Sequence, residues 1–417
     1  MSMGKDKDIY FPSNLLMVKK DAVSAIPAAA LIVALFPILI TNFATISIYL
    51  LIIFFFFFDS TKIVVSRHLL KTAMIMLSGV FIMAYSYDKE PIVHLMRQPP
   101  DQSSVLTSML STSAICFIVF IQGYLYSFTV KRPLSLLGYV FLYEWVLVGI
   151  YFIVAYGFVT GNALMLGSIT VILLPYMYLV LEGKPRVRFI LSSIVLLYLM
   201  LILSRTAFVA ATIFFLTYFL YPYLIVTKIR YKLFFPFFMM LIFLLMAIYL
   251  LSGFDFLDDF SRTYFGGKPI RSGRDLLWPE LLPYIMDKPL LGYGVNQDSG
   301  YFQASEILKF RGLDAHNIYL EMLVRGGFLL FSFFIILFYK IWGSFYSINN
   351  NKMSRIAASG LLAFLFLGAG IPIGLRGNII LNTLLWFYWG VASGNTWINN
   401  HQLQAQVRRS DLCNRLV

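Results

Sequence analysis

Residues 233–251 read LFFPFFMMLIFLLMAIYLL, an uncharged apolar run that follows the basic segment KIRYK at 228–232. A helix over such a run is long enough to cross the hydrocarbon core of a bilayer, which takes about 20 residues. The rest of the chain has the same character, since 59% of its residues are hydrophobic and 13% are charged. Soluble domains carry about 25% charged residues. With a mean hydropathy of +0.79, the sequence predicts a polytopic membrane protein.

Apolar runs of this kind recur along the chain and predict an all-α fold with about 12 transmembrane helices. They lie at 24–40, 43–58, 69–86, 105–127, 134–157, 163–181, 189–203, 206–226, 233–251, 321–342, 356–373 and 379–394. The predicted layout has five parts. They are an N-terminal segment at 1–23, spans one to nine at 24–251, a large polar loop with short helices at 252–320, spans ten to twelve at 321–394, and a basic tail at 395–417.

The basic residues predict how these spans are oriented. They gather in alternate connections and at both ends of the chain, while the short turns between hold few. Because cytoplasmic loops collect Lys and Arg, both termini are expected in the cytoplasm and the loop at 252–320 on the opposite side of the membrane. The formal net charge of +13 then reflects membrane topology, and no nucleic-acid partner is expected.

Metal and disulfide chemistry are not expected. Cys116 lies in an apolar run and Cys413 in the basic tail, so they are not a disulfide pair, and the four histidines are scattered without metal-binding spacing. We expect no metal site and no cofactor.

Several arginines stand on the predicted outer side. Arg205 occupies a very short turn, where an arginine is costly unless it is paired or faces water; a snorkelling contact with a lipid headgroup is the alternative. Arg271 and Arg274 precede a predicted amphipathic helix whose apolar face holds Trp278, Leu281, Leu282 and Ile285. Arginines at a helix N-terminus favour an anion, although they also suit an ordinary solvated loop. Arg376 lies in another nearly uncharged outer turn.

Residues 316–327 predict a proton-accepting side chain and pairs of side chains along one helix. His316 stands at the start of the helix that runs into span ten, and imidazole is the side chain suited to take a proton near neutral pH. Asn317 with Glu321, and Glu321 with Arg325, have i,i+4 spacing. Gly326 and Gly327 allow a kink or close packing. Elsewhere, Glu144 is a carboxylate in mid-span, and it is either functional or a buried hydrogen-bonding partner.

Arginines with a general base and no acidic cluster suit a pyrophosphate substrate and metal-independent chemistry. The order SRTAF at 204–208, SGRDLLWPELLPYIMDKPLLGYG at 272–294 and HNIYLEMLVRGG at 316–327 resembles the O-antigen ligase/polymerase superfamily of bacterial envelope glycosyltransferases. In layout the resemblance extends over the whole chain, and in motif over roughly residues 204–330.

The resemblance implies an inverting, metal-independent enzyme that takes a glycan from undecaprenyl pyrophosphate on the periplasmic side. It implies that Arg205 and Arg274 bind the pyrophosphate, that His316 activates the acceptor hydroxyl, and that Asn317, Glu321 and Gly327 follow the family pattern. The expected partners are the lipid-linked donor, a lipid-linked glycan or lipid A core as acceptor, membrane lipids and a chain-length regulator.

Polymerisation of repeat units into O-antigen or a capsule-like polysaccharide is the leading expectation, and ligation to lipid A core is the alternative. A flippase or transporter also fits twelve spans, but transporters usually show two similar halves, whereas the polar residues here lie mostly between spans nine and ten. A structural scaffold for a polysaccharide assembly complex is a further alternative, in which Arg205, Arg274 and His316 would be replaceable.

Overall fold

A computed structural model describes residues of the compact unit Ile75–Val417, one of two units in the chain. The residues described are 163–181, 183–251, 278–293, 317–347, 350–370 and 379–416, with Phe120, Gly123, Tyr124, Leu142, Trp145, Val146, Asp259, Arg262, Thr263 and Arg274. Over these residues the secondary structure is helical, without strands, which confirms the predicted all-α class.

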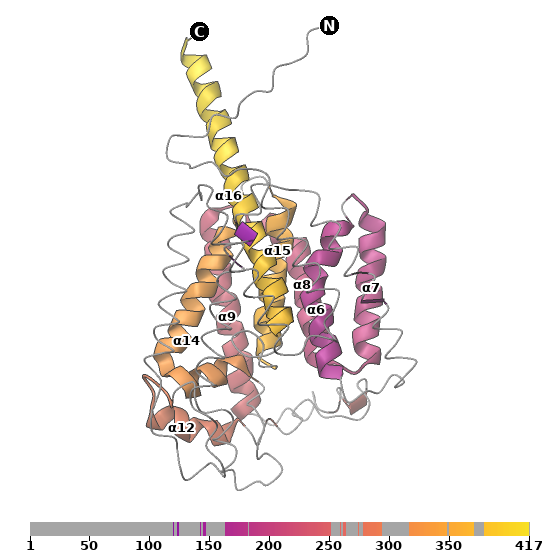
Figure 1. The fold of residues 1–417 in the computed structure, drawn as a ribbon, viewed down its shortest axis with the longest axis vertical. Helices are drawn as coiled ribbons and strands as arrows, with labels where there is room; N and C mark the ends of the chain where they lie inside the picture. The colour runs from indigo at the N-terminus through magenta and orange to yellow at the C-terminus, as the bar shows by residue number, and fades with distance from the viewer. Residues whose placement is uncertain are drawn as a thin grey trace, which may run out of the picture. The chain divides into compact units, whose positions relative to one another are not determined.

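The helices follow the predicted apolar runs from residue 163 onward (Figure 1). They are α6 (Ala163–Val180), α7 (Pro185–Leu201), α8 (Arg205–Leu224), α9 (Lys228–Leu251), the 3-10 helix η2 (Pro279–Leu281), α12 (Leu282–Asp287), α14 (Ile318–Ser344), α15 (Lys352–Gly368) and α16 (Ile379–Leu416). Three described helices are long and apolar enough to cross a membrane: Arg205–Leu224, Lys228–Ile248 and Ile318–Ser344. This indicates a multi-pass membrane protein, while nearly all of the predicted spans between 24 and 157 lie outside the described residues.

Helix α15 forms the centre of this unit (Figure 1). Its residues from Ile356 to Leu365 are all buried, and it packs most extensively against α8, with further contacts to α6, α16 and α14. Gly360 lets α15 approach α6 closely, because a Cβ there would lie 2.8 Å from Cγ of Pro175. Small residues permit such close helix packing.

Large apolar side chains are exposed on the outer helices. They include Phe189, Ile190, Ile194 and Leu197 of α7, Leu216, Phe219 and Leu220 of α8, and Leu233, Phe237, Met240 and Leu244 of α9. Water-soluble proteins rarely expose contiguous apolar surface on this scale. These faces are suited to contact lipid.

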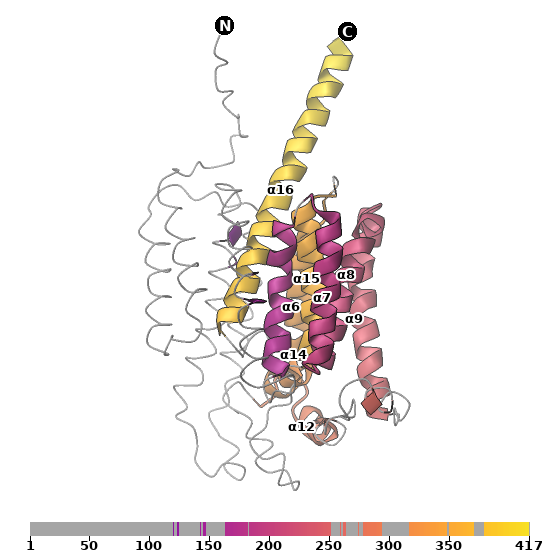
Figure 2. The same ribbon diagram turned by 90° about the vertical axis from the view of Figure 1, so that its right-hand side faces the viewer.

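Helix α16 extends beyond the end predicted for span twelve and passes the other helices (Figures 1 and 2). It has 38 residues, and the sequence after Gly394 holds no proline or glycine that would end it. Near its start, Gly390 lies against Phe120, whose carbonyl oxygen would be 2.1 Å from an added Cβ. The predicted basic tail at 395–417 is therefore helical through Leu416.

Candidate functional site

Arg205 is the first residue of α8, and a tight turn from α7 positions it. The N–H of Leu203 bonds the carbonyl of Met200 at 3.0 Å, and the N–H of Ser204 bonds the carbonyl of Leu199 at 3.0 Å. This is the pattern of a Schellman motif, which usually has glycine at its left-handed position. Here that position is Leu203, with φ 58°, a conformation that costs a non-glycine residue about 1–2 kcal/mol. Strain of this kind is often found beside functional residues.

Arg274, from the loop before η2, reaches the end of α15. Its Nη2 donates a hydrogen bond of 2.7 Å to the carbonyl oxygen of Gly370. Gly370 in turn lies against the start of α8, because a Cβ added to it would be 2.6 Å from Cγ2 of Thr206. Gly370 thus contacts Arg274 and the residue next to Arg205, and these are the two arginines predicted to bind pyrophosphate.

The start of α14 meets the same end of α15. The hydroxyl of Tyr319 donates to the carbonyl of Leu365 at 2.6 Å, and a Cβ added to Gly368 would be 2.8 Å from Cγ2 of Ile318. His316 lies outside the described residues, but it is two residues before Ile318 in the chain. The segments that carry Arg205, Arg274 and the beginning of α14 therefore converge on Gly368–Gly370, which we call the α15 junction.

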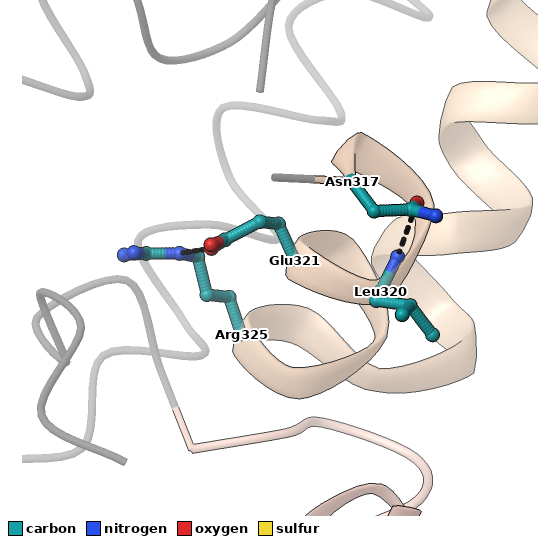
Figure 3. Close-up of polar contacts among 4 residues, drawn as sticks. All are labelled: Asn317, Leu320, Glu321 and Arg325. Carbon is teal, nitrogen blue, oxygen red and sulfur yellow. Dashed lines mark hydrogen bonds and ion pairs between the residues drawn. The ribbon is translucent and has the colours of Figure 1, made fainter. Parts of the chain in front are cut away.

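Asn317 fixes where α14 begins. Its side-chain oxygen accepts hydrogen bonds from the N–H groups of Tyr319 at 2.9 Å and Leu320 at 3.2 Å, and its Nδ2 lies 3.7 Å from Sδ of Met246. This is an N-cap (Figure 3). The predicted side-chain pair between Asn317 and Glu321 is wrong, because the backbone amides at the helix start take up the Asn317 oxygen.

We expect Asn317→Ala to lower the free energy of unfolding by about 1–2 kcal/mol, since it leaves buried N–H groups without an acceptor. The measurement is the apparent Tm of the purified full chain in detergent. Asn317→Ser is the matched variant, because serine retains a capping oxygen, and it should recover most of the loss. Equal destabilisation by serine and alanine would contradict a capping role.

The second predicted pair is confirmed. Nε of Arg325 lies 2.7 Å from Oε2 of Glu321 one helical turn earlier (Figure 3). Both residues are buried, with Arg325 3% and Glu321 7% exposed. Buried charges are tolerated when they are paired and hydrogen-bonded. This ion pair links two successive turns near the start of α14 (Figure 3).

Helix α14 is interrupted at Gly327, as the paired glycines predicted. Gly327 has φ 59° and ψ −161°, a conformation that is essentially confined to glycine. The N–H groups of Phe328 and Leu329 then bond the carbonyls of Pro289 at 2.7 Å and Leu290 at 3.2 Å, outside the helix. The loop segment after α12 thereby supplies the acceptors that the broken helix lacks.

Gly292, near the end of the motif at 272–294, lies against the same interruption. It has φ 64°, and a Cβ there would lie 2.5 Å from the carbonyl carbon of Arg325. The N–H of the next residue, Tyr293, donates to the carbonyl of Val324 at 2.8 Å. Glycine is needed at this position for both its backbone conformation and the close approach.

The loop helices pack on α14 through an apolar cluster. Its buried members are Trp278, Leu281, Ile285, Tyr293, Leu320 and Val324. The prediction that Leu282 shares this face is wrong, since its side chain is 43% exposed. The reason is the 3-10 geometry of η2, which turns 3.0 residues per turn and rotates Leu282 off the face that an α-helix would give it.

Tyr293, a member of this cluster, also makes a polar contact with Asp287. Its hydroxyl donates to Oδ2 of Asp287 at 2.5 Å. Burial, reinforced by the Asp287 carboxylate, raises the pKa of Tyr293 above its ordinary value of 10.0. The phenol therefore remains a hydrogen-bond donor at neutral pH, and this contribution to stability is lost only as the pH rises above about 10.

The structure thus brings Arg205 and Arg274 to one place with the start of α14. Arg271, His316, Arg376 and Glu144 lie outside the described residues, so their assigned roles stay predictions. The glycines of the α15 junction were not predicted as part of the site. Their only signal in the sequence is the GAG at 368–370, directly after an apolar run.

Residues 190–335 match the family model described as O-Antigen ligase. A candidate polysaccharide ligase of Rickettsia conorii is 24% identical over 150 residues, 34% of this chain and 33% of that protein. One of Rickettsia typhi is 30% identical over 149 residues, 34% of each chain. The match therefore spans about a third of the length of these relatives.

The matched residues contain Arg205, Arg274, Asn317 and the Gly327 interruption, the features that the three motifs predicted. Residues 190–335 of this chain are thus similar to the O-antigen ligase family, which confirms the predicted resemblance.

Proposed function

We propose that this protein is a membrane glycosyltransferase that moves a glycan from undecaprenyl pyrophosphate to an acceptor at the periplasmic face of the bacterial inner membrane. The observation that carries the proposal is the α15 junction. There Arg274 bonds Gly370, Gly370 contacts Thr206 beside Arg205, and Gly368 contacts Ile318. Residues at least 50 positions apart in the sequence contact each other there, in an arrangement that suits one anionic substrate.

The proposed chemistry uses the arginines and one base. An acceptor hydroxyl attacks the anomeric carbon of the donor sugar, a new C–O bond forms, and the bond from that carbon to the pyrophosphate oxygen breaks. The pyrophosphate leaves with the electron pair, and Arg205 and Arg274 stabilise its charge without a metal. His316 accepts the hydroxyl proton, and the anomeric configuration is inverted.

Two acceptors remain as proposals. Polymerisation onto the next lipid-linked repeat unit follows from the sequence prediction. Ligation to lipid A core is the second candidate, and the observation that favours it is that the matched family and both relatives are named for ligases.

The two acceptors are distinguished by the glycans of a host that lacks the gene. A surface ladder that collapses to core plus one repeat unit would support polymerisation. Long chains retained on undecaprenyl pyrophosphate, with bare core, would support ligation. Failure of glycan to leave the inner leaflet would reject both and indicate a transporter.

Complementation of that host tests the base. We expect His316→Gln to reduce glycan transfer by about 10²–10⁴-fold, the usual contribution of general base catalysis. His401→Gln is the matched control, because His401 is exposed on α16 and should leave transfer unchanged. Transfer at the normal rate by His316→Gln would reject histidine as the base and favour a scaffold role.

A further inference from the structure

Two arginines flank one tyrosine near the starts of α7 and α15. Arg188 of α7 places its Cζ 5.6 Å from the ring centroid of Tyr218, and Arg355 of α15 places its Cζ 3.9 Å from the same centroid. Arg188 donates to the Tyr218 hydroxyl, and Arg355 donates to the Tyr218 carbonyl oxygen. We call Arg188, Arg355 and Tyr218 the arginine pair site.

The positive charge of this site has no compensating carboxylate on the helices that form it. Helices α6, α7, α8, α9 and α15 contain no Asp or Glu anywhere in their sequences. Within the described residues, the hydrogen bonds of both guanidinium groups are to Tyr218. Two like charges brought to one ring repel each other, so an anion that contacts both would be favoured.

The surrounding backbone adds to this preference. Arg188 and Arg355 each lie at the start of a helix, where the partial charge of the helix dipole is positive. The N-cap of α7 is Lys184, which makes no capping hydrogen bond through its side chain. Both arginines are half-buried rather than enclosed, which leaves them accessible to a ligand.

Exposed apolar residues on both sides of the site indicate that the anion belongs to a lipid. Val187, Phe189 and Ile190 of α7 and Phe219 and Tyr223 of α8 are between 44% and 69% exposed. A ligand with a phosphate and acyl chains would place its charge on the arginines and its chains along these faces. Basic pockets between transmembrane helices recognise anionic headgroups in this manner.

We propose that the arginine pair site binds the phosphate of an acidic phospholipid, on the end of α8 opposite Arg205. The site would bind this lipid whether or not the protein is a glycosyltransferase. The bound lipid would hold α7, α8 and α15 together at the membrane surface through contacts that a zwitterionic lipid supplies less well.

Lipid binding to the purified full chain is the test, with phosphatidylglycerol as the probe. We expect phosphatidylglycerol in mixed micelles to raise the apparent Tm, and phosphatidylcholine at the same concentration to raise it less. Arg188→Gln with Arg355→Gln should weaken the apparent affinity for phosphatidylglycerol by roughly fivefold for each arginine lost. Lys228→Gln with Lys232→Gln is the matched control, since these lysines are exposed on α9 beside the same end of α8, and it should keep most of the response.

Two results would overturn the proposal. An unchanged phosphatidylglycerol response in the double arginine variant would reject the site. An equal rise in Tm with inorganic phosphate alone would reject the assignment to a lipid. If the double variant does not fold, the single variant Arg188→Gln and Tyr218→Phe replace it. The first should lose affinity roughly fivefold and the second, which keeps both charges, should retain it; the reverse order would contradict the proposal.

Discussion

Replacing Arg274 by lysine is expected to lower glycan transfer by about 10²–10³-fold, the typical effect of removing one donor that stabilises charge in the transition state. One nitrogen of Arg274 donates to the Gly370 carbonyl at 2.7 Å, and a guanidinium holds five N–H donors in a planar fork that matches phosphate oxygens. A lysine ammonium has no such fork and acts as a point charge. The same loss is expected for Arg205→Lys at the start of α8.

The measurement is transfer from a lipid-linked donor by the purified chain, supported by the surface glycan ladder in the complemented host. Arg262→Lys is the matched control, because Arg262 belongs to the same polar loop and is exposed. It should transfer glycan normally. Full activity in either Arg205→Lys or Arg274→Lys would show that transfer does not need a bidentate contact from that arginine.

The largest effect on folding is expected from Gly327→Ala. At φ 59° and ψ −161° an alanine is strained, and its Cβ would lie 2.3 Å from the carbonyl carbon of Leu290 and 2.5 Å from the carbonyl oxygen of Pro289. Backbone strain and overpacking each cost about 1–3 kcal/mol. We expect a marked fall in apparent Tm and cleavage of the 252–320 loop at lower protease concentration.

Gly343→Ala, in the same helix, separates this effect from the general response of α14 to alanine. A Cβ at Gly343 meets no atom within 4 Å, and alanine is a better helix former than glycine by about 1 kcal/mol. This variant should be as stable as the natural chain or more so. A Gly327→Ala protein that matched it in stability would show that the interruption of α14 is not required.

Hydropathy predicted the helices well where the sequence contains long apolar runs. The run at 206–226 became α8, beginning at Arg205, and the run at 321–342 lies within α14. The i,i+4 pair of Glu321 and Arg325 was also predictable, because it depends only on helical periodicity. The end of α16 was missed, since hydropathy marks where a lipid-facing run ends and not where a helix ends.

The site was predictable in its residues but not in its assembly. Arg205 and Arg274 were identified from their outer position, yet their link through Gly370 joins segments that share no periodicity. Asn317 was misassigned because spacing alone cannot distinguish a side-chain pair from an N-cap. Leu282 was misassigned because a 3-10 helix, and not an α-helix, begins at Pro279. Which of the two forms depends on what the loop packs against.

The interruption at Gly327 has a consequence for how the protein is made. The amides of Phe328 and Leu329 take their acceptors from Pro289 and Leu290, residues that leave the ribosome before them. In hydrocarbon, an amide without an acceptor costs several kcal/mol. With the proposed topology, the loop must therefore cross the membrane first. The carbonyls of Pro289 and Leu290 must then be in position before α14 can form its interruption. The loop segment is synthesised before α14, and it must also fold before α14 does.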